Sequence, residues 1–221
     1  METRRNVKFQ ANNVVMIEGT IYTFFEYDHS WKGQRFYNFT LAVRRTSGTI
    51  DYMPCSISEM KIEKIRDWKG RRVKVIGRFN SYGNHVNGRN MKSYEVDVLS
   101  LEPIAEEEDD DNMVVLLGNL ISEPKLRITK KGRKIADLWI SVKNDNGKMN
   151  SFPVIVWGDT TRRLKYATPG TPMKIVGRLQ SRKRVIRNDE ENIEEEITYY
   201  EISAKDIEFY DEFDVDADGA I

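Results

Sequence analysis

The chain has 221 residues, in which 35 Lys and Arg balance 35 Asp and Glu, and 39% of the residues are hydrophobic. Its apolar runs are only a few residues long, and no apolar stretch follows the N-terminal METRRNVKFQ, so the sequence predicts neither a membrane span nor a secretory signal. Cys55 is the only cysteine, which excludes an internal disulfide and a cysteine-based zinc site and favours a reducing cytoplasm.

The first 105 residues are predicted to form five strands and one short helix. Apolar residues occupy every second position from 37 to 43, the period of a strand with one face in a core. The segment Thr46-Ser47-Gly48 suits the turn to the next strand. A short helix is expected between Ser58 and Gly70.

An acidic run, EEEDDD, follows at residues 106–111. Such a run repels itself and packs poorly, so it is predicted to be a linker or a solvated edge.

Residues 112–210 repeat the order of the first elements. The strand KIVGRLQS at 174–181 restates KVIGRFNS at 74–81, and earlier strands of the two copies align at an offset of 99 residues. The offset grows to 100 and then to 106 only in connections, where insertions are tolerated. A turn at 145–147 and a helix that begins at Asp159 are expected in this copy.

Three strands, a helix and two strands in each copy predict an all-β fold with short helices, built as two tandem five-stranded OB-fold barrels. The formal charge of zero hides the nature of these units. Residues 1–105 carry a net charge of +6 and residues 112–210 a net charge of +5, whereas 106–111 carry −6 and the C-terminal tail, 211–221, carries −5. The sequence therefore predicts two basic domains, an acidic linker and an acidic tail.

The second copy contains GNLISEPKLRITKKGRKIADLWISV at 118–142, PVIVWG at 153–158 and VGRLQSRKR at 176–184. These segments resemble the bacterial and phage single-stranded DNA-binding protein family over nearly all of residues 112–208. The first copy matches mainly through its alignment with the second. The resemblance implies OB folds that coat single-stranded DNA without sequence preference in replication, recombination or repair, with no cofactor.

The resemblance also implies an assembly of four OB domains, which a homodimer of this two-domain chain would supply. Family members commonly dock replication or repair proteins on an acidic tail, and the same is expected of this tail, although DEFDVDADGAI lacks the usual Pro-Phe ending. A bacterial or phage protein in the cytoplasm, associated with the nucleoid, is the implied location. Arg184 stands where the family often has a stacking tryptophan.

In the second copy, Trp139 is predicted to point away from the core, where it stacks on a base or packs under a loop or at a subunit contact. Trp157 has apolar neighbours on both faces of its strand, so base stacking and core burial both remain open. Basic residues expected to neutralise phosphates are Arg127, Lys130, Lys131 and Arg133 in the first loop and Arg178, Arg182, Lys183 and Arg184 toward the fourth hairpin. The acidic stretch 189–196 is expected to be the solvated end of that hairpin, able to fold back over its basic arm.

In the first copy, Thr40 replaces Trp139, and stacking is assigned to Phe36 and Tyr82 unless this half serves in dimerisation. The candidate DNA-binding residues here are Phe36, Lys32, Arg35, Arg78, Tyr82 and Arg89, with Trp31, His85 and Lys92 nearby. Phe24 and Tyr27 are assigned either to the same surface or to a loop core.

No catalytic or metal-binding pattern is found. His29 and His85 are far apart and near no set of ligands with metal spacing, and no phosphate-binding glycine motif is present, so an enzyme is not predicted. Two alternatives to DNA coating stay open: an adaptor for RNA or replication restart, and a structural subunit whose OB domains mainly contact protein.

Overall fold

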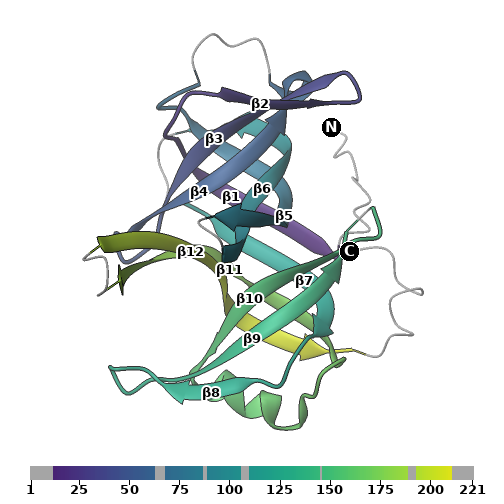
Figure 1. The fold of residues 1–221 in the computed structure, drawn as a ribbon, viewed down its shortest axis with the longest axis vertical. Coiled ribbons are helices and arrows are strands. Elements are labelled where there is room, and N and C mark those ends of the chain that lie inside the picture. The colour runs from purple at the N-terminus through teal and green to yellow at the C-terminus, as the bar shows by residue number, and fades with distance from the viewer. Residues whose placement is uncertain are drawn as a thin grey trace.

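The computed structural model describes residues 12–62, 68–86, 89–105, 110–144, 146–188 and 193–210. They form two β-barrels stacked along the long axis of the molecule (Figure 1). The first half contains β1 (Asn13–Ile21), β2 (Glu26–Trp31), β3 (Gln34–Arg44), β4 (Ile50–Ser58), the 3-10 helix η1 (Glu59–Lys61), β5 (Arg72–Val86) and β6 (Arg89–Pro103). The second half contains β7 (Asn112–Leu120), β8 (Lys125–Ile128), β9 (Lys134–Lys143), β10 (Met149–Trp157), the 3-10 helix η2 (Gly158–Tyr166), β11 (Pro172–Asn188) and β12 (Ile193–Phe209).

Each half closes into a five-stranded barrel with the same connections. In the first, the strand order is β3-β4-β6-β5-β1, and β1 returns to pair with β3; the second repeats this with β9-β10-β12-β11-β7. The pairings of β4 with β6 and of β10 with β12 are parallel, and the other pairings are antiparallel. The predicted OB fold is thus confirmed in both halves.

Two strands were not predicted. Residues 26–31 form β2, and residues 125–128, which include the Arg127 expected in a loop, form β8; these strands pair with β3 and β9 at the two ends of the sheet. Their side chains are all exposed, so no apolar alternation marks them as strands. The helix expected at Asp159 is the 3-10 helix η2; Asp159 lies inside its first turn, and Trp157 occupies the capping position. Of the helix expected between Ser58 and Gly70, residues 59–61 form the 3-10 helix η1, and 63–67 lie outside the described residues.

The repeated glycines explain why one strand is spelled twice. Gly77 and Gly177 lie where β5 approaches β6 and β11 approaches β12, and a register shift precedes each of them. A Cβ at Gly177 would stand 2.5 Å from the carbonyl oxygen of Ser203, and one at Gly77 would meet that of Asp97 in the same way. The close approach of the neighbouring strand therefore requires glycine at this position in both copies.

A repeated asparagine clamps the same place. Asn13 donates to the carbonyl oxygen of Phe79 at 2.7 Å and accepts from its backbone N–H at 3.0 Å. Asn112 makes the same two contacts with Leu179, both at 2.8 Å. The scaffold is thus duplicated down to single side-chain hydrogen bonds.

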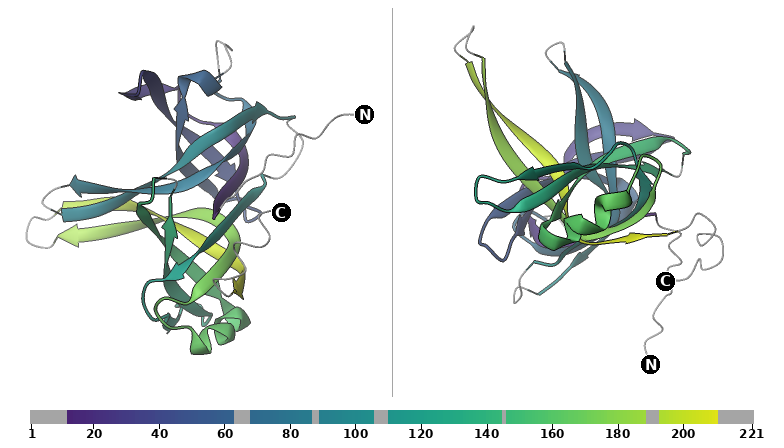
Figure 2. Two further views of the ribbon diagram at one scale, coloured as in Figure 1. Left: turned by 90° about the vertical axis from the view of Figure 1, so that its right-hand side faces the viewer. Right: turned by 90° about the horizontal axis from the view of Figure 1, so that it is seen from below.

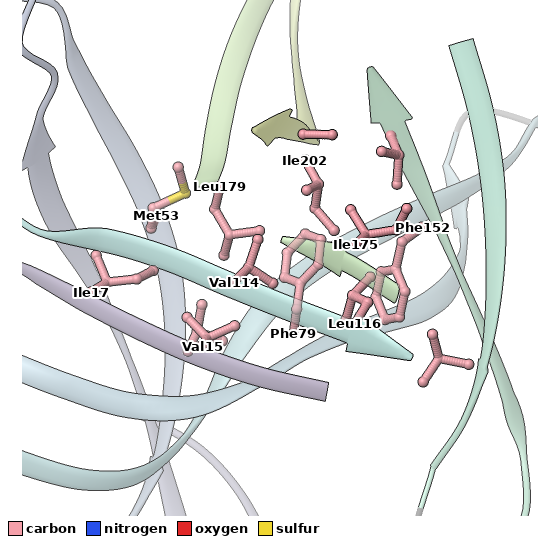
Figure 3. Packing of buried hydrophobic residues seen from close by; sticks show 14 of the residues in the cluster. Val15, Ile17, Met53, Phe79, Val114, Leu116, Phe152, Ile175, Leu179 and Ile202 are labelled. Atoms are coloured by element: carbon pink, nitrogen blue, oxygen red, sulfur yellow. The ribbon is translucent and has the colours of Figure 1, made fainter. Parts of the chain in front are cut away.

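The two barrels are joined by backbone and by core. Strands β1 and β7 pair antiparallel from Asn13–Leu116 to Ile17–Asn112, so one twelve-stranded sheet runs through both halves. Buried side chains of both halves form one continuous cluster, in which the rings of Phe79 and Phe152 stack with centroids 5.0 Å apart (Figure 3). The halves therefore pack as one body.

A buried ion pair adds a polar bridge between the halves. Asp51, on β4, is fully buried and accepts two hydrogen bonds of 2.6 Å from the guanidinium group of Arg45. The same carboxylate accepts from the backbone N–H and the hydroxyl group of Ser181 in the second half, both at 2.8 Å. Arg45 also donates to the carbonyl oxygen of Ser181 at 2.8 Å.

The predicted acidic linker lies only partly in the described residues, since 106–109 fall outside them. Asp110, at its end, is not a solvated residue: its carboxylate accepts from the backbone N–H of Arg44 at 2.6 Å and pairs with Arg72 at 2.9 Å. This carboxylate is largely shielded from solvent. Although the run repels itself, the charge of Asp110 is compensated by Arg72 of the first half.

Candidate nucleic-acid interface

A groove of about 700 Å³ opens on the second barrel, between the β8–β9 hairpin and strands β11 and β12. We call it the arginine groove. The cationic and aromatic residues that line it are Arg45, Arg127, Arg133, Lys134, Trp157, Arg178 and Arg182. Five of these seven were predicted from the sequence as DNA-binding residues.

Strand geometry explains how the arginines converge. Arg178, Gln180 and Arg182 alternate along β11, so their side chains point to one face. Arg127 projects from β8 and forms an ion pair with Asp137 on β9, and Arg133 lies where the tight turn at Gly132 leads into β9. Arg45 reaches the groove from the first half, held by Asp51 and Ser181.

Trp157 forms part of the groove wall. Its side chain is half-buried, and its indole N–H donates to the hydroxyl group of Ser203 on β12 at 3.0 Å. The ring is therefore fixed in orientation while part of it still faces the groove. Of the two alternatives that the sequence left open for Trp157, the structure excludes full core burial.

The groove is strongly positive. Glu201 is its one lining carboxylate; it is buried, accepts from Gln180 at 2.8 Å and lies 3.8 Å from Arg182. Six cationic side chains surround it, and Asp137 and Asp51 offset only Arg127 and Arg45. A planar guanidinium group binds phosphate through two hydrogen bonds, so the groove suits a phosphate chain with bases stacked beside it.

The first half has a counterpart of different chemistry. A cavity of about 100 Å³ is lined by Asn12, Asn13, Arg78, Asn80, Asp97, Val142, Lys143, Asn144, Asn146 and Asn150. We call it the amide cavity. Asn80 donates to Asp97 at 3.0 Å and accepts from Asn150 at 3.1 Å. Burial raises the pKa of Asp97 above that of an ordinary aspartate.

Comparison with known proteins separates the two halves. The model of the single-strand binding protein family matches residues 111–210, which hold the arginine groove. The single-stranded DNA-binding protein of Enterococcus faecalis is 33% identical over 78 residues, which cover 32% of this chain and 42% of that protein. The chain thus aligns with less than half the length of this curated relative.

Solved structures extend the likeness to both barrels. The wild-type single-stranded DNA binding protein from Thermus aquaticus superposes with a TM-score of 0.70 over 90% of this chain and 93% of that chain, at 20% identity. A deletion mutant of the same protein gives a TM-score of 0.67 over 90% and 95% of the two chains, at 21% identity. At such identity the likeness establishes the fold, an arrangement of two OB barrels.

Other residues of the second half that were predicted to bind DNA lie beside the groove. Lys130 and Lys131 are exposed in the turn between β8 and β9, and Arg184 is exposed on β11. Lys183 is also exposed, and it pairs at 2.7 Å with Glu196 on the neighbouring strand β12, a contact within the hairpin. Residues 189–192 of the predicted acidic stretch lie outside the described residues. Trp139 points outward as predicted, with 40% of its surface exposed, but it does not line the groove.

The candidates of the first half do not gather in one groove. Phe36 is half-buried and stacks on His29 with centroids 4.9 Å apart, while Lys32 lies over the ring of Trp31 and Arg35 is exposed. Arg78 lines the amide cavity, and Tyr82 is exposed on β5. The side chain of Arg89 lies outside the described residues, as does that of His85. Phe24 and Tyr27 are 62% and 58% exposed, so neither forms a loop core.

Three features were missed by the sequence reasoning. Lys134 lines the groove beside the predicted Arg133, and Arg45 reaches this groove from the first half, a placement that no local pattern indicates. Tyr22 and Tyr52 form a ring pair with centroids 4.8 Å apart on the outer face of the first barrel, where both are partly exposed. The alignment of the two copies held one indication of this placement. The backbone N–H of Tyr22 donates to the carbonyl oxygen of Thr40, and that of Ile121 donates to the carbonyl oxygen of Trp139, so Tyr22 lies beside the position that Trp139 occupies in the second copy.

Among the described residues, no group of three or more His, Cys, Asp or Glu side chains is placed to hold a metal ion. Cys55 is buried, and burial raises the pKa of its thiol, so the sulfur stays protonated. In the described part of the chain, no helix has the length and apolar character needed to span a membrane.

Proposed function

We propose that the protein binds single-stranded DNA along the arginine groove, with little preference for base sequence. One observation carries the proposal: five guanidinium groups and the fixed, half-buried ring of Trp157 face the same groove of about 700 Å³. The match of residues 111–210 to the single-strand binding protein family model and the name of the Enterococcus faecalis relative support DNA as the polymer.

The chemistry of the groove favours binding that is independent of base sequence over recognition of a specific sequence. Guanidinium groups contact phosphates, which every sequence offers, and an indole ring stacks on any base because every base has a π face. Such a protein binds and protects single strands in replication, recombination or repair and catalyses no step. This activity would place it in the cytoplasm, at the nucleoid of a bacterium or in a phage-infected cell.

We further propose that two chains assemble, giving four barrels. The outer face of the central sheet carries half-buried apolar side chains on both sides of the β1–β7 seam: Val14, Met16, Ile76, Met113, Val115, Leu117 and Val176. Ion pairs of Lys74 with Glu18 and of Lys174 with Glu208 flank them. The two halves contribute equivalent residues, so a second copy related by a two-fold axis meets a face like its own.

Sedimentation equilibrium of the full chain tests this assembly. We expect twice the chain mass of 25.8 kDa, and reversion to a single chain when Met16 and Val115 are both changed to Asp. A parent protein that sediments as one chain at micromolar concentration contradicts the dimer.

Titration of oligo(dT), oligo(U) and duplex DNA at two salt concentrations tests the main proposal, with tryptophan fluorescence as the readout. We expect tight binding of oligo(dT), much weaker binding of duplex, and a log-log salt slope of about −0.7 for each phosphate contact. Equal affinity for duplex and oligo(dT) would sink the coating proposal. Preference for oligo(U) would instead favour an RNA adaptor, and no binding of any of the three would favour a subunit that contacts protein.

Docking of replication or repair proteins through the acidic tail is a separate proposal. Residues 211–221 lie outside the described residues, and their five carboxylates are the feature that supports it. Pull-down of partners by the full chain but not by a chain ending at Tyr210 would support the docking.

A further inference from the structure

The long β5–β6 hairpin of the first half leans on the second barrel. Both long hairpins, β5–β6 and β11–β12, project to the same side of the molecule (Figure 2). At the base of β5–β6, the rings of Phe79 and Tyr94 lie 5.0 Å and 6.4 Å from that of Phe152 on β10. Asn150, on the same strand, donates to Asn80 at 3.1 Å. These contacts fix where the next residues of the hairpin reach.

Lys92 is one of those residues. It lies two positions before Tyr94 on β6, so the two side chains point to the same face of the strand. Its ammonium group donates to the hydroxyl group of Ser151, the neighbour of Phe152, and lies 5.9 Å from the centre of the Trp139 ring. A cation of the first half therefore lies over the ring of Trp139, the aromatic residue of β9 in the second barrel.

This arrangement leaves Trp139 without a core role. The side chain is 40% exposed, and its neighbours Leu138 and Ile140 are buried, so the pleat directs the indole away from the barrel. Neither Trp139 nor Lys92 nor Ser151 lines the arginine groove. The ring and the ammonium group together offer what a nucleotide needs: a flat stacking surface and a cation within reach of its phosphate.

We propose that Trp139, Ser151 and Lys92 form a second nucleotide subsite, built jointly by the two halves. A base stacks on the indole, and the ammonium group moves from the ring and from Ser151 to the neighbouring phosphate. A strand that fills the arginine groove reaches this subsite only when it is long enough to cross toward the first half. The inference rests on the proposed binding of single-stranded DNA and adds a place on its path.

The test compares Lys92→Met with Lys165→Met in the full chain. Lys165 offers a matched control, because its ammonium group lies 5.1 Å from the ring of Tyr166 in η2, outside the groove and the subsite. We expect Lys92→Met to weaken binding of an oligo(dT) of about 30 nucleotides several-fold at low salt and to leave one of about 8 nucleotides nearly unchanged. Lys165→Met should change neither, and Lys92→Arg should restore the long oligonucleotide.

Coupling to Trp139 completes the test. Trp139→Ala should weaken binding of the long oligonucleotide less in the Lys92→Met background than in the parent, since both groups serve one nucleotide. Thermal melting of each variant should match the parent, because both side chains are exposed. Equal behaviour of Lys92→Met and Lys165→Met, or additive effects with Trp139→Ala, overturns the subsite while leaving the groove intact. A parent protein that fails to bind oligo(dT) at all overturns both the proposed function and the subsite.

Discussion

The two halves of the chain have the same barrel fold, but the residues that line the arginine groove and the amide cavity differ. Where the arginine groove has Arg45 and Ser203, the aligned positions of the amide cavity hold Asn144 and Asp97. The glycines at the register shifts and the asparagines that bond to Phe79 and Leu179 are identical in both copies. Residues that shape the backbone are thus kept, while several residues that line the groove and the cavity have diverged.

The difference is mainly one of charge. The groove of the second half gathers six cations around one buried carboxylate, whereas the amide cavity, lined by residues of both halves, sets Arg78 and Lys143 among amides and a half-buried aspartate. The sequence gives both halves nearly the same net charge, so the contrast arises from where the charges lie. We therefore expect the second half to provide most of the contacts to phosphates, with Arg45 contributed by the first half.

The largest contrast is expected at the bridge between the halves. Asp51→Ala removes a fully buried carboxylate and leaves Arg45 unpaired, which should lower the free energy of unfolding by about 3–5 kcal/mol. Asn150→Ala, at the aligned position, removes a neutral amide contact and should cost about 1–3 kcal/mol. Urea denaturation of both variants measures the difference. Equal costs would mean that the ion pair does not hold the halves together.

A second contrast concerns affinity. Arg178→Gln should weaken binding of oligo(dT) by about 1.5 kcal/mol and reduce the steepness of its salt dependence, because an exposed cation of the groove is lost. Arg78→Gln is the aligned change in the amide cavity and should have a smaller effect on both quantities. The reverse order, with Arg78→Gln the more damaging, would place the main phosphate path on the first half.

The sequence predicts features that depend on residues close together in the chain better than features that depend on contacts between distant segments. Alternation and turn glycines are local signals, and they predicted the barrels, the outward direction of Trp139 and the positive φ of Gly48 and Gly147. The basic residues of β11 were found for the same reason, since period-two spacing puts Arg178 and Arg182 on one face.

Features that depend on the packing of two barrels were not predictable in this way. Arg45 and Asp51 look like hairpin residues of the first copy, and only the pairing of β1 with β7 brings them to Ser181. The contact of Lys92 with Trp139 has the same origin, because it requires the hairpin of one barrel to lean on a strand of the other. Strands β2 and β8 were missed since their pairing is set by the edge of the neighbouring strand and not by burial.

The smallest effect is expected from the acidic tail. A chain that ends at Tyr210 should bind oligo(dT) more tightly than the full chain at low salt, because five carboxylates then no longer compete with phosphates for the groove. The gain should shrink as the Debye length falls to about 8 Å at 0.15 M ionic strength. Fluorescence titration at several salt concentrations measures it, and identical curves for the two chains would show that the tail does not compete.

The central claim is that single strands lie in the arginine groove of the second half, against Trp157. Chains that keep one tryptophan and carry Phe at the other three positions test it directly, after thermal melting has shown that they fold. A chain that keeps only Trp157 should lose much of its fluorescence when oligo(dT) binds, whereas one that keeps only Trp68, which is 5% exposed in the first half, should lose almost none. Unchanged fluorescence of Trp157 in a chain that still binds oligo(dT) would contradict the account.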